Sequence, residues 1–171
     1  MWNLSFALEL SEVVEGNLNV NSEIGIILPT YCEAANIREL IYEIENLGLN
    51  ASILVIDDSS PDGTADIVRN VQGEYDNILI FVRPKKSGLG TAITDGFKIF
   101  LSLKEPPKCI VAMDADYSHN PKDILRLVSN LRDGCDLVIG SRYCKRGNVT
   151  DWSAVRLAIS KVANSVASLV I

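Results

Sequence analysis

Two aspartates spaced two residues apart, Asp114 and Asp116, follow an apolar run and have the chemistry of a ligand site. Side chains two residues apart on an extended backbone point the same way, so both carboxylates can face one ligand. Carboxylate oxygens suit Mg²⁺ or Mn²⁺, and such a cation neutralises charge on a diphosphate leaving group. Taken alone, the pair is also compatible with an Asp-rich turn that caps the following helix.

A second acidic pair, Asp57 and Asp58, ends another apolar run and favours the ligand interpretation of the first pair. Carboxylates in this place can accept hydrogen bonds from ribose hydroxyls or base nitrogens. The residues that follow are typical of a turn and a helix start. We therefore expect Asp58 to face a nucleotide, with little effect on folding when its charge is removed, while Ser60 and Pro61 begin a helix.

The elements that must position these residues are short apolar runs separated by helical patterns. Runs rich in Ile, Val and Leu predict buried parallel strands at 24–28, 53–56, 78–82, 109–113 and 137–139. Helical spacing predicts three apolar faces, made of Ile37, Leu40, Ile41, Ile44 and Leu47; of Leu89, Ala92, Ile93, Phe97 and Leu101; and of Ile124, Leu127, Val128 and Leu131. Alternating strands and helices predict an α/β fold, mainly a parallel sheet with helices on both faces.

Residues capable of chemistry are concentrated just after the predicted strands, where parallel sheets bind ligands. Tyr31 offers a ring for stacking, Glu33 an acceptor, and Arg142 a guanidinium that can clamp a phosphate. The alternatives are a packing role for the aromatic ring and a surface salt bridge for the arginine. The Gly88-Leu89-Gly90 segment lacks the spacing of a dinucleotide fingerprint, and no GxxxxGK[ST] loop is present, so ordinary dehydrogenase and P-loop interpretations fail.

Bulk properties narrow the class of protein further. The 171 residues suit one compact domain, and a net charge of −6 without a basic run argues against a nucleic-acid partner. Four cysteines without a CxxC pair, and a single histidine, argue against a zinc site and favour reduced thiols in the cytoplasm. The first 20 residues lack the basic region of a signal peptide, and no apolar run is long enough to span a bilayer.

Five ordered segments carry a more specific signal. They read PTYCE at 29–33, DDSSPDGT at 57–64, GLGTA at 88–92, MDADYSHNP at 113–121 and GSRY at 140–143, and a W…R…S…N pattern follows at Trp152, Arg156, Ser160 and Asn164. Together these segments resemble glycosyltransferase family 2, and within it the dolichol-phosphate (polyprenyl-phosphate) mannosyltransferases. The resemblance implies a Rossmann-like nucleotide-diphospho-sugar transferase fold (GT-A) over 23–171, after an N-terminal extension at 1–22.

The resemblance implies an inverting, metal-dependent transfer of mannose from GDP-mannose to a polyprenyl (dolichyl) phosphate at a membrane surface. The residues it implies for nucleotide-sugar binding are Pro29, Tyr31, Glu33, Ile56, Asp58, Asp114, Ala115, Asp116 and Arg142. It places Mg²⁺ or Mn²⁺ at Asp116, with Asp114 and Ser118 as further ligands, and gives catalytic roles to Asp116 and Arg142. A phosphate monoester is already ionised near neutral pH, so positioning and leaving-group stabilisation would carry the catalysis.

The chain departs from the family pattern in two places. Cys32 stands where the family usually has asparagine, next to the expected nucleotide. The chain also ends before a segment that in the family adds basic phosphate contacts and acceptor-site residues. We therefore expect a domain truncated at its C-terminal end, which binds the donor and needs a further polypeptide segment or membrane subunit for rapid transfer.

Other interpretations remain open from the sequence alone. They are a polyprenyl-phosphate glucosyltransferase, another family 2 transferase with a different donor, and a truncated relative that binds nucleotide sugars without turnover. The final stretch predicts an amphipathic helix that either packs in a core or lies on a membrane, with apolar positions Val155, Ile159, Val162, Val166 and Leu169. The expected location is peripheral, at the cytoplasmic face of a membrane.

Overall fold

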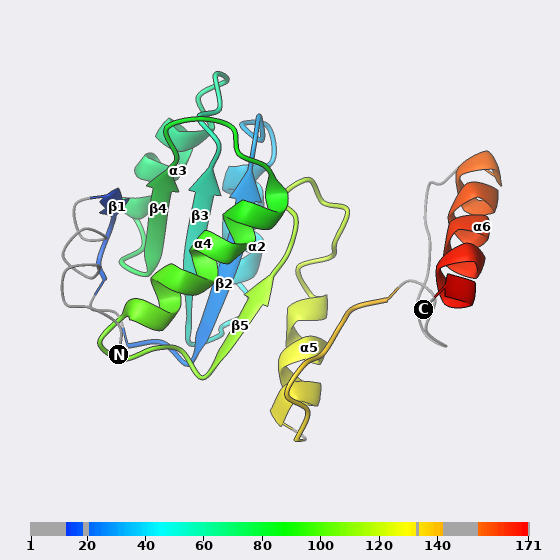
Figure 1. Ribbon diagram of the computed structural model, residues 1–171. Coiled ribbons are helices and arrows are strands. Elements are labelled where there is room, and N and C mark those ends of the chain that lie inside the picture. The colour runs from blue at the N-terminus through cyan, green and yellow to red at the C-terminus, as the bar shows by residue number, and fades with distance from the viewer. Residues whose placement is uncertain (1–12, 19–20, 133, 142–153, 171) are drawn as a thin grey trace. The chain divides into compact units, whose positions relative to one another are not determined.

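The computed structural model describes residues 13–18, 21–132, 134–141 and 154–170 (Figure 1). The chain divides into two compact units, Met1–Val138 and Ile139–Ile171. Each unit is described by itself.

The first unit contains a five-stranded sheet in the order β1-β4-β3-β2-β5 (Figure 1). The short edge strand β1 is antiparallel to β4, and the other neighbours are parallel. Because β3 and β4 lie on one side of β2 and β5 on the other, the strand order reverses between β2 and β5. The strands are β1 (Val14–Glu15), β2 (Ile24–Thr30), β3 (Ala51–Asp57), β4 (Ile78–Val82) and β5 (Cys109–Ala112).

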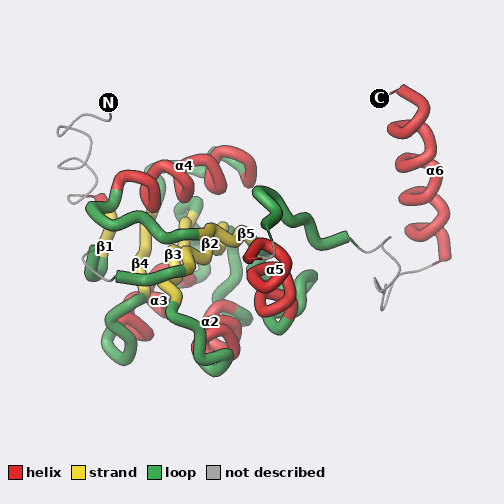
Figure 2. The backbone as a smooth tube through the Cα atoms, turned by 90° about the horizontal axis from the view of Figure 1, so that it is seen from below, coloured by secondary structure: helices red, strands yellow, loops and turns green. Residues whose placement is uncertain are grey.

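Helices cover both faces of this sheet. One face carries α4, and the other carries α2, α3 and α5 (Figure 2). The strands bury side chains toward both layers: Ile26 and Ile53 pack with the α2 and α3 side, and Ile27 and Leu54 with the α4 side. The predicted α/β fold is thus confirmed. The helices are α2 (Ile37–Glu45), α3 (Thr64–Gln72), α4 (Leu89–Ser102) and α5 (Asp123–Arg132).

One predicted strand is wrong. Residues 137–139 form no strand, and the side chains of Leu137 and Ile139 are 75% and 76% exposed. A strand is stabilised by a hydrogen-bonded partner and a buried face, and three apolar residues in a row guarantee neither.

The predicted buried face of α4 is also wrong in part. Leu89, Phe97 and Leu101 are exposed, and the helix instead packs through a stripe that includes Gly96 and Phe100. Gly96 explains why this face of α4 packs on the sheet, because a Cβ at position 96 would lie 2.8 Å from the Ile27 side chain. The helix can therefore approach the sheet closely only with Gly96 facing it.

Both predicted helix starts, at Pro61 and at Pro121, are too early: α3 begins at Thr64 and α5 at Asp123. Gly63, directly before α3, has φ 87°. Before α5, the Asn120 side chain accepts a hydrogen bond from the Lys122 backbone N–H, as expected of a cap residue. The sequence did not predict β1, which lies within the expected extension 1–22 and is tied to α3 by the Arg69–Glu15 ion pair.

The second unit contains one described helix, α6 (Ala154–Val170). A helix was expected here, and four apolar side chains on it, Val155, Ile159, Val162 and Val166, are exposed. Within the described parts of the chain, no helix combines the length and the apolar character needed to cross a membrane.

The contact between β2 and α4 yields a stability prediction. A Cβ added at Gly25 would lie 2.9 Å from ring atoms of Phe100, which is fully buried. Gly25→Ala should therefore lower the free energy of unfolding by about 1–3 kcal/mol in urea titrations. The double variant with Phe100→Leu should recover part of the loss, whereas Gly90→Ala, with nothing within 4 Å, should not destabilise. Additive losses in the double variant would contradict this contact.

Candidate functional site

The carboxyl ends of β2, β3 and β5 bring most of the predicted site residues to one edge of the sheet. Pro29 in β2 is the register partner of Ile56 in β3. The Ile56 side chain is fully buried in the core, and its expected role in nucleotide binding stays a prediction. The loops that follow these strands flank the place where the strand order reverses, which is where open α/β sheets bind ligands.

The loop after β3 is closed by Asp57. Its carboxylate accepts hydrogen bonds from the Thr30 hydroxyl at 3.0 Å, the Ser60 backbone N–H at 2.8 Å and the Ser60 hydroxyl at 2.6 Å. The Ser60 Oγ in turn accepts the backbone N–H of Cys32 at 2.9 Å. The loops after β2 and β3 are therefore linked, although Cys32 and Ser59 adopt left-handed backbone conformations with φ 63° and 54°.

Asp62, further along the loop after β3, also links this loop to the loop after β2. Its carboxylate accepts the Ala34 N–H at 3.0 Å and the Thr64 hydroxyl at 2.6 Å. The Thr64 Oγ1 also accepts the Glu33 N–H at 3.0 Å. The hydrogen bond from Thr64 is the largest cause that lowers the pKa of Asp62 below its usual value. The backbone around Glu33 is thereby fixed without any ligand.

Asp58 is buried, and its carboxylate is already hydrogen-bonded within the protein. One oxygen bonds the Arg83 guanidinium, with an Nε–Oδ1 distance of 2.5 Å. The other accepts the backbone N–H groups of Ser87 and Gly88 at 3.1 and 3.0 Å, so it caps the start of α4 from a neighbouring strand. The expectation that Asp58 could lose its charge with little effect on folding is therefore wrong, because burial of Arg83 needs this partner.

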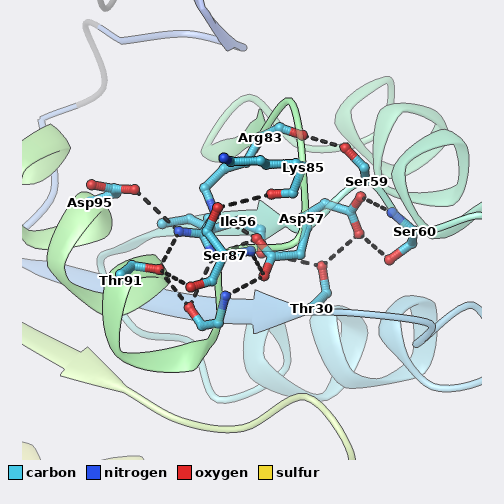
Figure 3. Close-up of polar contacts among 12 residues, drawn as sticks. Thr30, Ile56, Asp57, Ser59, Ser60, Arg83, Lys85, Ser87, Thr91 and Asp95 are labelled. Carbon is cyan, nitrogen blue, oxygen red and sulfur yellow. Dashed lines mark hydrogen bonds and ion pairs between the residues drawn. The ribbon is translucent and has the colours of Figure 1, made fainter.

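Arg83 is the residue that sequence reasoning missed. It follows β4 directly and is only 4% exposed. Its guanidinium donates to the Thr91 hydroxyl at 2.7 Å, to the Gly88 carbonyl at 3.0 Å and to the Asp95 carboxylate at 3.3 Å (Figure 3). The sequence did contain a signal for this role. An arginine directly after an apolar strand is expected to be buried, and a buried cation needs carboxylates as partners.

Tyr31 lies beyond β2 with its ring partly exposed. The Lys86 Nζ, from the loop after β4, lies 3.4 Å from the centre of this ring. The ammonium is attracted to the ring face, in a contact typically worth about 0.5–1 kcal/mol at exposed sites. The loops after β2 and β4 are thus in contact through Tyr31 and Lys86, and Tyr31 is 41% exposed with Lys86 over one face of its ring.

The two aspartates after β5 are accessible on either side of a buried residue. Ala115 is buried against the core, whereas Asp114 is partly exposed and Asp116 is exposed. The Asp116 Oδ1 accepts the Ser118 backbone N–H at 2.9 Å. Hydrogen bonds from the Ser118 backbone and hydroxyl are the largest causes that lower the pKa of Asp116. Asp116 is consequently ionised at neutral pH, as a cation ligand must be.

The donor atoms after β5 fit a hard divalent cation. Among the described residues, no group of three or more His, Cys, Asp and Glu side chains is arranged to hold a metal. Two carboxylates with the Ser118 hydroxyl instead make an open set of oxygen donors. Mg²⁺ is commonly bound by one or two carboxylates, with water and substrate phosphates as its other ligands.

Arg142, the expected phosphate contact, lies outside the described residues, as does Trp152. Ser160 and Asn164 of the W…R…S…N pattern lie on α6 in the second unit. The roles expected for all these residues stay predictions.

The mostly parallel sheet with helices on both faces is a Rossmann-like GT-A fold. The model of the family described as "Glycosyl transferase family 2" matches residues 25–167, and the chain belongs to this family. A solved structure with 18% sequence identity and a TM-score of 0.51 shares the fold. It is mannosyl-3-phosphoglycerate synthase from Rubrobacter xylanophilus, and the match covers 75% of this chain and 39% of that one.

Two curated relatives are more similar in sequence. The chain is 38% identical over 143 residues to a dolichol-phosphate mannosyltransferase of Pyrococcus furiosus, and 38% identical over 141 residues to a polyprenol monophosphomannose synthase of Mycolicibacterium smegmatis. Each match covers 82% of this chain. It spans 39% of the length of the first relative and 52% of the second.

The buried ion pair yields a prediction that separates Asp58 from its neighbour. Asp58→Asn leaves a buried guanidinium without its main counter-charge and should cost about 3–5 kcal/mol of unfolding free energy. Asp95→Asn is the matched control, because the Asp95 side chain is 32% exposed and lies 3.3 Å from Arg83. Urea titrations should show a loss below about 1 kcal/mol for this control. Similar losses for both variants would contradict the structural role assigned to Asp58.

Proposed function

We propose that this chain forms the donor-binding part of an inverting mannosyltransferase that moves mannose from GDP-mannose to a polyprenyl phosphate. The observation that carries the proposal is the pair of accessible carboxylates after β5, next to the reversal of strand order. The names of the two relatives support the sugar and the class of acceptor. The loop after β2, with the accessible ring of Tyr31, supports a nucleoside next to the diphosphate.

In this proposal the chain's own residues bind and orient the donor. Tyr31 stacks on the base, and Asp114 and Asp116 face the diphosphate with a cation between them. The Ser118 N–H donates to Oδ1 of Asp116, and Asp114 and Asp116 would hold the cation. Bound Mg²⁺ or Mn²⁺ would neutralise charge on the departing diphosphate. The loops after β2 and β3 are held by hydrogen bonds within the protein, so ordering them on ligand binding should cost little conformational entropy.

The acceptor side of the proposal rests on chemistry more than on described residues. A polyprenyl phosphate is already ionised near neutral pH, so its oxygen can attack the sugar without a strong general base. Such a lipid resides in a membrane, so we propose that the protein acts at a membrane surface. Arg142 would contact phosphate, and further protein elements or a membrane subunit would complete the acceptor site.

The metal-bridged diphosphate can be tested by calorimetry. GDP should bind at least about tenfold more tightly with Mn²⁺ than in EDTA, because the carboxylates otherwise repel the diphosphate. Asp116→Ala should abolish most of that difference without lowering the melting temperature. Asp76→Ala, which removes an exposed carboxylate before β4, should keep it. Equal GDP affinity in Mn²⁺ and EDTA for the wild type would reject the metal bridge.

The donor can be tested separately by comparing nucleotide sugars. With Mn²⁺ present, GDP-mannose should bind at least about tenfold more tightly than UDP-glucose, a difference of roughly 1.4 kcal/mol. A mannose-labelled lipid should form when GDP-[¹⁴C]mannose and a short polyprenyl phosphate are supplied. Preference for UDP-glucose would identify a glucosyltransferase. Tight donor binding without any labelled lipid would favour a binding module.

A further inference from the structure

His119 closes the loop that carries the two accessible aspartates. Its Nδ1 lies 3.1 Å from the backbone nitrogen of Asp114 and accepts that N–H. Its Nε2 lies 3.9 Å from Oδ2 of the same residue. The imidazole therefore contacts both the backbone and the carboxylate of Asp114, five residues earlier in the chain.

The hydrogen bond fixes the state of the ring. A nitrogen that accepts an N–H carries no proton, so in the neutral imidazole the proton is on Nε2. This Nε2–H lies on the side of the Asp114 carboxylate. The side chain of His119 is 46% exposed and does not belong to the buried core. The ring lies close enough to Asp116 to interact with it electrostatically as well.

Because Asp114 lies directly after the sheet, the hydrogen bond to its N–H affects the direction of its side chain. The preceding residue still belongs to the sheet pattern, because the Met113 N–H donates to the Ile27 carbonyl at 3.2 Å. Asp114 is the first residue beyond that pattern, and the orientation of its peptide sets where its side chain points. Asp116 is held at the other end of the same loop by the Ser118 N–H.

We propose that His119 is a positioning residue for the cation and the diphosphate: by accepting the Asp114 N–H, it holds the two carboxylates in the directions they need to share one ligand. The inference rests on the proposed function, since the shared ligand is the cation of a nucleoside diphosphate. His119 itself does not ligate the cation in this proposal. It acts through Asp114.

Two amide substitutions separate this role from the alternatives. The Oδ1 of an asparagine lies close to where Nδ1 of histidine lies, so His119→Asn can still accept the Asp114 N–H. Glutamine places its amide near Nε2 instead, so His119→Gln cannot, and His119→Ala removes both contacts. All three substitutions are at a side chain outside the buried core and should leave the melting temperature nearly unchanged.

The measurement is GDP affinity by calorimetry, with Mn²⁺ and in EDTA. We expect His119→Gln and His119→Ala to weaken binding about tenfold with Mn²⁺ and to leave binding in EDTA unchanged. His119→Asn should stay within about threefold of the wild type in both conditions. In nitrogen-15 NMR spectra of the metal-free protein, the Asp114 amide should shift in the glutamine and alanine variants and remain in place in the asparagine variant.

Several results would overturn the inference. Wild-type affinity in all three variants would show that the hydrogen bond is irrelevant to binding. Equal losses in Mn²⁺ and EDTA would show general disturbance of the loop. If His119→Gln kept the wild-type affinity for GDP with Mn²⁺ while His119→Asn lost it, the result would indicate that Nε2 of His119 ligates the cation. If the wild type itself bound GDP equally with Mn²⁺ and with EDTA, the proposed function would fail, and the role of His119 would fall with it.

Discussion

A buried ion pair between Asp58 and Arg83 holds together the edge of the sheet at which the site lies. Asp58 comes from the end of β3 and Arg83 from the end of β4, and both reach the start of α4 through hydrogen bonds. Because the two charges are removed from water, each depends on the other. The ends of two strands and the start of a helix therefore form one cooperative unit.

The loops of the site are attached to this unit in different ways. The loop after β2 is fixed to the loop after β3 by hydrogen bonds from Cys32 and Ala34 to Ser60 and Asp62. The loop after β5 is closed on itself by His119 and Asp116. The loop after β5 also contacts α2, through the hydrogen bond from the Tyr117 hydroxyl to Glu43.

The sequence predicted what depends on local pattern. Four parallel strands were evident from runs of Ile, Val and Leu, although only Val111 of β5 is buried. The accessibility of Asp114 and Asp116 followed from a period of two. Ion pairs between distant residues could not be predicted. Arg83 lies 25 residues from Asp58, and the sequence around neither residue indicates that they pair. The buried face of α4 depended on the fit of Gly96 against Ile27, which is also a contact between distant segments.

Three residues other than glycine have left-handed backbones in the loops after β2, β3 and β5: Cys32, Ser59 and Tyr117, with φ of 63°, 54° and 60°. Such conformations cost of order 1 kcal/mol or more for most side chains, and asparagine tolerates them better than cysteine. Cys32 therefore bears more backbone strain than an asparagine would in the same conformation. The hydrogen bond from the Cys32 N–H to the Ser60 Oγ holds the backbone in this conformation, so the contact between the two loops maintains a strained turn that carries an exposed thiol.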